Sequence, residues 1–471
     1  MSLQRISDEN QAILDNKREF VLIRELQNFF SCPVRVRKLI YGTSDIDDTQ
    51  ITEIIHLIDR FLQSTMDMVR LKTAHELAIS ILKATDIEEF EFLRAGVWKR
   101  EISDTFMYSN CRDHTVHSVN NYLLGLYLHE KVPLVRNVWE KTLQFNNTYP
   151  NSFITIWPIV SVCHDIGYIF EGVLEKHNIT SNHIHLRNGA DLINEYFAHQ
   201  IWYSCSLHSL DTREKIKQLA KIQSVLNLRT EINELAEDLI RIEDPQSLIK
   251  FITTNRPNSL PFDAFDLWIT YFKSWNQNNM AERFSKLRKI FIDVINIGHP
   301  QNHFRMLDHG VCGGLMFLQY TTFFHRLLFG VCNSIPSSTE SENIKNNFME
   351  TLNYFDYSDA NWWWSHLVWA TATNAIHNLQ QDESYTKELP SISLEEDPLT
   401  FLSILVDCLQ EWDRPYVKRS LSKVPIQGID CSLKVVNGKV IIGYGSEDKK
   451  RTIEKTLDRS LTDWRKIVEI I

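Results

Sequence analysis

Residues that break helices are scarce in this sequence. It contains 15 glycines and 13 prolines among 471 residues. The segments between them carry apolar residues three and four positions apart, which is the spacing of one helix face. Ile51, Ile54, Ile58 and Phe61 show this spacing clearly. The sequence therefore predicts a mainly α-helical protein.

Cysteine pairs are also missing. The eight cysteines are scattered, without a C-x-x-C pair and without the short framework of a disulfide-rich secreted domain. We interpret them as reduced thiols that mostly pack in the core. Zinc ligation by thiolates is the less favoured alternative, and the cysteines nearest to other candidate ligands are Cys111, Cys163, Cys312 and Cys408.

Long apolar runs and an excess of basic residues are both absent. No apolar run approaches the length of a membrane span, and the first ten residues lack the profile of a signal peptide. The net charge of -10 weakens the case for broad nucleic-acid binding, which needs a basic face. With 43% hydrophobic and 23% charged residues, we expect a soluble, cytoplasmic globular protein without membrane contact.

Titratable residues interrupt two of the apolar helical stretches. His114 and His117 lie three residues apart, so they share one face of a helix. His164 and Asp165 are adjacent and can converge only if the helix unwinds after them, which Gly167 permits. Burying these groups is costly unless something compensates, and a bound cation is the simplest compensation. The four residues therefore predict part of a metal site.

Further candidate ligands follow in three later segments. Arg305 and His309 share a face at a spacing of four, and His377 ends an alanine-rich helical stretch. Asp407 interrupts an apolar stripe. Asp413 is the alternative to Asp407, but it lies beside Arg414-Pro415, where we expect the helix to end.

The order of these residues resembles the HD-domain superfamily of metal-dependent phosphohydrolases, in which H, HD and D lie on successive helices. The resemblance rests on the segments Val-Cys-His-Asp-Ile-Gly, Asp-His-Gly-Val-Cys-Gly-Gly-Leu, Ala-Ile-His-Asn and Val-Asp-Cys-Leu-Gln-Glu-Trp. It covers residues 108–415, interrupted by an insertion. Many family members carry lysine after the His-Asp-Ile-Gly run, whereas this chain has Tyr168, which puts a direct lysine contact with phosphate in doubt.

The resemblance implies one or two divalent metal ions. A first metal would be held by His117, His164, Asp165 and Asp407. Asp165 would bridge to a second metal held by His309 and His377. Nitrogen and carboxylate ligands suit manganese, iron, magnesium or zinc, and ligand type does not decide among them.

The candidate catalytic residues are Asp165, His114 and Arg305. His114 is a donor behind the ligands, an alternative first ligand or a substrate contact. Arg305 is the first choice for a phosphate clamp because it lies one turn before His309. The alternative clamps are Arg112 and Arg187.

Two other groups have structural interpretations. His183 and His185 offer further contacts, but a helix N-terminus capped by Ser181 or Asn182 explains them equally well. The tryptophans at 362–364 and Trp369 could stack on a nucleobase, although packing against the core is the interpretation that we favour.

These observations predict hydrolysis of a phosphoester by metal-activated water. The resemblance alone makes a nucleotide or cyclic nucleotide the leading small phosphorylated substrate. The alternatives are a non-catalytic sensor that binds a nucleotide or a partner, and a nuclease, which the acidic charge balance disfavours. Whether the chain forms a homo-oligomer stays open.

We expect five segments along the chain. They are an N-terminal helical layer (1–100), the first half of an HD-like core (101–198), a helical insertion (199–300), the second half of the core (301–415) and a C-terminal β-hairpin with a helix (416–471). Asn437-Gly438 between two β-branched runs predicts a type I′ turn. We expect the final helix from about residue 450 to the last residue.

Overall fold

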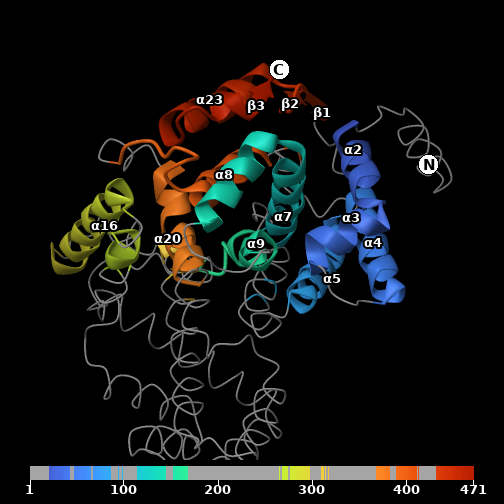
Figure 1. The fold of residues 1–471 in the computed structure, drawn as a ribbon, viewed down its shortest axis with the longest axis horizontal. Helices are drawn as coiled ribbons and strands as arrows, with labels where there is room; N and C mark the ends of the chain where they lie inside the picture. Colours follow the sequence, from blue (N-terminus) through green and yellow to red (C-terminus); the bar gives the residue numbers. More distant parts are fainter. Residues whose placement is uncertain are drawn as a thin grey trace, which may run out of the picture.

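The described part of the chain is mainly helical, with a small sheet near the C-terminus (Figure 1). The computed structural model describes residues 21–42, 47–64, 67–85, 94, 98, 114–144, 152–167, 265, 268–273, 276–297, 309–311, 313–314, 317, 367–381, 389–410, 412 and 431–471. None of the helices in these ranges is long and apolar enough to cross a membrane.

An N-terminal helical layer covers one side of the core (Figure 1). It consists of α2 (Val21–Phe30), α3 (Pro33–Val36), the π-helix η1 (Arg37–Tyr41), α4 (Asp48–Gln63) and α5 (Asp67–Ala84). The Asp47 side chain caps α4 by accepting a hydrogen bond from the Thr49 backbone N–H. The predicted apolar stripe of α4 is confirmed, because Ile51, Ile54, Ile58 and Phe61 are buried.

Five helices form the centre of the fold, and α7 is buried along most of its length. They are α7 (His114–Lys131), α8 (Pro133–Gln144), α9 (Ser152–Val162), α20 (Trp369–Gln381) and α22 (Pro398–Leu409). Helix α7 packs against α5, α9 and α22, so its polar residues are as buried as its apolar ones. Helix α9 contains Pro158 in its interior.

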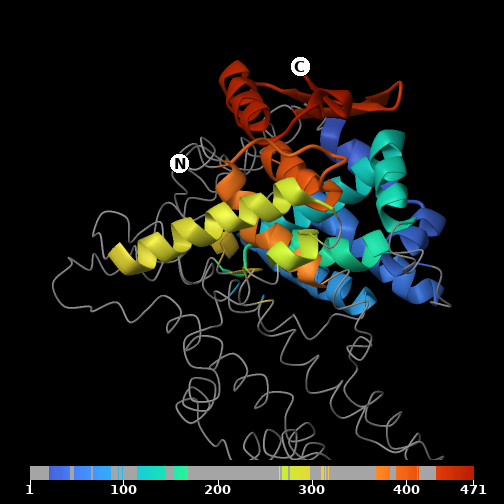
Figure 2. The same cartoon turned by 60° about the vertical axis from the view of Figure 1, so that its left-hand side comes forward.

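The described end of the expected insertion packs onto α20. Helix α16 (Asn278–Ile297) lies beside α20 in both views (Figure 2). Arg283 is 1% exposed and donates to Gln380 Oε1 over 3.0 Å. The Trp268 indole donates to Thr371 Oγ1 over 3.0 Å. The described residues between Phe265 and Ile297 are therefore joined to the core.

The C-terminal module, residues 431–471, contains the three-stranded sheet. Strands β1 (Cys431–Val436) and β2 (Lys439–Tyr444) are antiparallel, and the chain turns between them through Asn437 and Gly438. Both turn residues have positive φ, 53° and 73°, which confirms the predicted type I′ hairpin. Helix α23 (Glu447–Ser460), the 3-10 helix η5 (Trp464–Lys466) and β3 (Val468–Ile470) complete the module.

The expectation of one helix up to the last residue is wrong. Leu461, directly after α23, is extended, and the chain then forms η5 and a strand parallel to β2. The physical reason is visible in β3, where Val468 and Ile470 are buried and Glu469 between them is exposed. This alternation has the period of a strand and not of a helix.

Trp369 is a core residue. Its ring stacks on Trp139 with centroids 5.2 Å apart, and its indole N–H donates to Asp397 Oδ1 over 2.9 Å. Only 2% of Trp369 is exposed, which confirms the packing interpretation. The tryptophans at 362–364 lie outside the described residues.

His129 extends the same aromatic cluster and makes the fold sensitive to acid. Its ring stacks on Phe153 at 3.9 Å, and neither ring nitrogen has a hydrogen-bond partner within the described ranges. Burial, followed by the charges of Arg136 and Lys38, lowers the pKa of His129 to about 3. An unfolded chain restores the ordinary pKa, so it binds the proton first as pH falls. His129 therefore does not change the stability of the folded state above about pH 6.5 and lowers it progressively below that pH.

Replacing His129 with phenylalanine is expected to flatten the dependence of stability on pH. The substitution retains the ring and removes a penalty of about 2 kcal/mol that develops between pH 7 and pH 5. Urea unfolding at a series of pH values measures this difference. His56→Phe is the matched control, because His56 is exposed on α4. Equal pH slopes for wild type and His129→Phe would contradict the assignment.

Candidate metal centre

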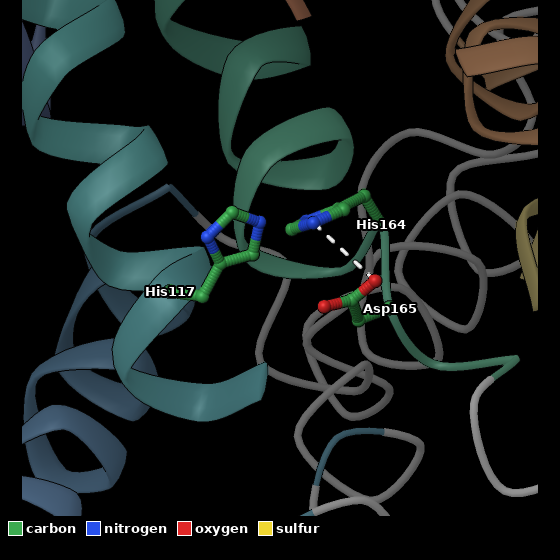
Figure 3. A group of neighbouring side chains, drawn as sticks. All are labelled: His117, His164 and Asp165. Carbon is green, nitrogen blue, oxygen red and sulfur yellow. Dashed lines mark ion pairs between the residues drawn. The ribbon is translucent and has the colours of Figure 1, made fainter. Parts of the chain in front are cut away.

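Five segments bring the sequence-predicted ligands together. Helix α7 carries His114 and His117, and the turn after α9 carries His164 and Asp165. The other ligands are His309 in the segment 309–311, His377 on α20 and Asp407 on α22. In Figure 3 the His117 ring points from α7 toward His164 and Asp165. All of the predicted ligands are buried except Asp407, whose side chain is 17% exposed.

A first ligand group contains His117, His164, Asp165 and Asp407. One ligand atom from each of the first three residues lies within 4.8 Å of the others. Asp407 Oδ1 lies 2.5 Å from His117 Nε2 and 3.9 Å from His164 Nε2. Two imidazole nitrogens and two carboxylates are thus available around one position.

A second ligand group contains Asp165, His309 and His377. Their ligand atoms also lie within 4.8 Å of one another. Asp165 Oδ1 lies 3.3 Å from His309 Nε2 and 3.4 Å from His164 Nε2. Asp165 therefore belongs to both groups and lies where a bridging carboxylate would be needed.

Three histidines are held in the same orientation. Each uses Nδ1 to contact an oxygen that can only accept, which makes Nδ1 the protonated nitrogen. His164 donates to the Ser161 carbonyl and His377 to the Asn374 carbonyl, both over 2.8 Å. His117 donates to Gln410 Oε1. In a neutral ring with this tautomer Nε2 carries a lone pair, as in a metal-binding histidine oriented from behind.

These lone pairs converge with carboxylate oxygens. His164 Nε2 is buried and accepts no hydrogen bond from any residue that the structure describes. His117 Nε2 directly faces Asp407 Oδ1. Atoms that carry lone pairs or negative charge repel one another unless a proton or a metal ion lies between them. The donor set and its orientation fit a divalent metal ion.

The protonation states are those of metal ligands. Burial lowers the pKa of His164 to about 3 and also lowers the pKa of His377. Burial alone would raise the pKa of both aspartates, but His164 beside Asp165 and His117 beside Asp407 bring each well below its usual value. Neutral His164 and His377 and ionised carboxylates are what metal binding requires.

A second layer of polar side chains holds the carboxylates. His114 Nδ1 lies 2.6 Å from Asp165 Oδ2, so His114 contacts the shared aspartate. Asp407 Oδ2 accepts from Gln381 Nε2 over 2.6 Å, and Asp407 Oδ1 accepts from Asn121 Nδ2 over 3.4 Å. The sequence interpretation did not include Gln381, Gln410 or Asn121. Their spacing was the available signal, since Gln381 follows His377 by one helical turn.

Gly167 permits the close approach of the two ligand-bearing segments. The helix ends before the two ligands and not after them as expected, because α9 ends at Val162 and His164 and Asp165 lie in the turn of residues 163–167. A Cβ on Gly167 would lie 1.9 Å from the His309 carbonyl oxygen and 2.5 Å from the Gly313 nitrogen. Glycine is needed here because no side chain fits between the turn and the backbone of His309.

The described cysteines behave as packed thiols. Burial raises the pKa of Cys163 to about 12, so this thiol stays protonated. Cys408 Sγ donates to Gln381 Oε1 over 3.2 Å. Several candidates lie outside the described residues, namely Arg305, Arg112, Arg187, His183, His185, Asp413, Tyr168, Cys111 and Cys312.

Comparison with models of protein families, with curated proteins and with solved structures finds no match to this chain. The interpretation of the site therefore rests on its own geometry and on the order of its residues.

Proposed function

We propose that this protein is a metal-dependent phosphohydrolase of the HD-domain type. The observation that carries the proposal is the convergence of two histidine and aspartate groups around the shared Asp165. They arrive in the chain order H, HD, H, H and D that the resemblance implies. His117, His164, Asp165 and Asp407 would hold one metal ion, and Asp165, His309 and His377 would hold a second.

The bound cation would supply Lewis acidity, which lowers the pKa of water and offsets negative charge on phosphoryl oxygens. The side chains of the site have the protonation states that this chemistry requires. Neutral His164 and His377 and the ionised aspartates offer lone pairs without first releasing protons. His114 contacts Asp165 Oδ2, which holds the carboxylate and places a proton-carrying group beside the reaction.

The substrate class and the phosphate clamp rest on the resemblance and the spacing of residues. We propose a small phosphorylated substrate, with a nucleotide or cyclic nucleotide as the leading class. Arg305 is assigned to the phosphate because it precedes His309 by one helical turn in the sequence.

Metal analysis followed by a phosphate-release screen tests the proposed function. Protein purified without chelators is expected to contain one or two divalent ions per chain and to release phosphate from nucleotides, or to open cyclic nucleotides. Removing the metal with a chelator should abolish turnover, and adding back manganese, iron, magnesium or zinc one at a time identifies the active ion.

Other results would point to other functions. Stoichiometric metal without turnover of any phosphoester would favour a sensor that uses the site for binding. Cleavage of single-stranded nucleic acid with no activity on nucleotides would favour a nuclease. Absence of metal from wild-type protein would contradict the proposal itself.

A further inference from the structure

Two glutamines contact candidate metal ligands of the first ligand group. Gln410 Oε1 accepts from His117 Nδ1, and Gln381 Nε2 donates to Asp407 Oδ2 over 2.6 Å. Gln410 is 1% exposed and follows the last residue of α22, whereas Gln381 is the last residue of α20. Both carboxamides therefore depend on where a helix ends.

The C-terminal module holds both of these helix ends. The Tyr444 hydroxyl donates to the Leu409 carbonyl over 2.5 Å, directly before Gln410. The Ser460 hydroxyl donates to the Gln380 carbonyl over 2.9 Å, and Arg459 donates to the Gln381 carbonyl. Terminal carbonyls of a helix have no partner within the helix, so these contacts satisfy them and fix the last turn. In Figure 1 the module lies across the ends of the central helices.

Backbone hydrogen bonds also join the C-terminal module to the segment between α20 and α22. The Ile392 N–H donates to the Ser460 carbonyl and the Thr462 N–H donates to the Ile392 carbonyl, both over 2.9 Å. The end of α23 is thereby joined to the segment that leads from α20 to α22. A shift of α23 would move the ends of both helices together.

We propose that the C-terminal module positions the metal ligands His117 and Asp407, acting through Gln410 and Gln381. The inference rests on the proposed function in so far as the first ligand group binds a metal ion. Tyr444 and Arg459 are positioning residues, since they act on helix ends and not on the ligands. Residues behind a metal ligand set its orientation, and a ligand displaced by about 1 Å no longer fits the ion.

The test compares the metal affinity of purified full-length variants by competition with a chromophoric chelator, using manganese or zinc alone. Gln410→Leu is expected to weaken binding about 10- to 100-fold, because His117 loses the acceptor that orients it. Tyr444→Phe is expected to weaken it about three- to tenfold, the effect of losing one buried hydrogen bond. Gln410→Glu retains the acceptor and is expected to restore most of the affinity.

A matched control and a double variant separate positioning from general stability. Tyr127→Phe also removes a buried hydroxyl, which donates to Glu25 Oε1 on α2 over 2.9 Å and has no contact with Gln410 or Gln381 in the described residues. It should lower the urea midpoint without changing metal affinity. The double variant Tyr444→Phe with Gln410→Leu is expected to bind the metal no more weakly than Gln410→Leu alone. The reason is that Tyr444 acts on His117 only through Gln410.

An unchanged affinity for Tyr444→Phe, or fully additive effects in the double variant, would overturn the inference while leaving the proposed function intact. Metal binding with the expected affinity series but without phosphoester turnover would support the inference and remove the proposed function. Wild-type protein that takes up no metal would overturn both.

Discussion

Replacing Asp165 with asparagine is expected to abolish both metal binding and phosphoester hydrolysis. Asp165 is the residue common to both ligand groups, and its carboxylate lies within 3.4 Å of both His164 Nε2 and His309 Nε2. Asparagine has nearly the same shape but lacks the negative charge that a divalent ion requires. We expect at least a 100-fold loss of metal affinity, about 3 kcal/mol or more, and turnover at background level.

Thermal unfolding with and without metal measures this loss independently of activity. Metal at 100 times its dissociation constant stabilises a folded protein by about 2.7 kcal/mol, so the wild-type midpoint should rise and that of Asp165→Asn should not. Asp397→Asn is the control. Asp397 is a buried carboxylate outside both ligand groups, and it accepts hydrogen bonds from the Trp369 indole and the Thr400 backbone N–H. It should lower the midpoint but preserve the response to metal. A full response in Asp165→Asn would refute the shared-ligand assignment.

The substitution Gly167→Ala, which adds one methyl group, is expected to have the next largest effect on stability and metal binding. The new Cβ would lie 1.9 Å from the His309 carbonyl oxygen, so the turn or the segment 309–311 must move. Overpacking of this kind costs about 1–3 kcal/mol of stability. The atoms that the new Cβ meets belong to the backbone, which cannot rotate away as a flexible side chain can. Since the displaced segment carries His309, the second ligand group should lose affinity as well. Urea unfolding and metal stoichiometry measure the two effects.

Gly313→Ala provides the matched control for this contact. Gly313 lies on the opposite side of the same interface, but its Cβ would lie 3.3 Å from the nearest atom, the Gly167 nitrogen. A shift of a few tenths of an ångström accommodates it, so the cost should be much smaller. Similar losses in the two variants would show that helix packing in general, and not the contact with His309, limits the substitution at Gly167.

Local patterns predicted much of the architecture. The α4 stripe and the Asn437-Gly438 turn depend on residues close in sequence, and each has the structure that its pattern indicates. The grouping of His117 with His164 and Asp165 could also be expected, because their order resembles a known arrangement. Ordered chemistry-bearing residues thus carry information that propensity alone does not.

Contacts between distant segments were not predictable. Gln410 was not identified as a partner of His117, because a glutamine at a helix end is common and the partner lies 293 residues away. Strand β3 has three residues and pairs in parallel with β2, so no turn signal joins the two. The role of Gly167 was only half anticipated, since flexibility can be inferred from the sequence but close approach cannot.

The separation of the ligands in sequence has a consequence for biosynthesis. His117 and Asp407 lie 290 residues apart, and Asp407 is held by a helix that the C-terminal module supports. During translation the two histidines of α7 leave the ribosome long before any carboxylate from α22 exists to join them. The cation would then be captured as a late event in maturation. Nascent chains that end before α22 would carry the histidines of α7 without the carboxylate of Asp407.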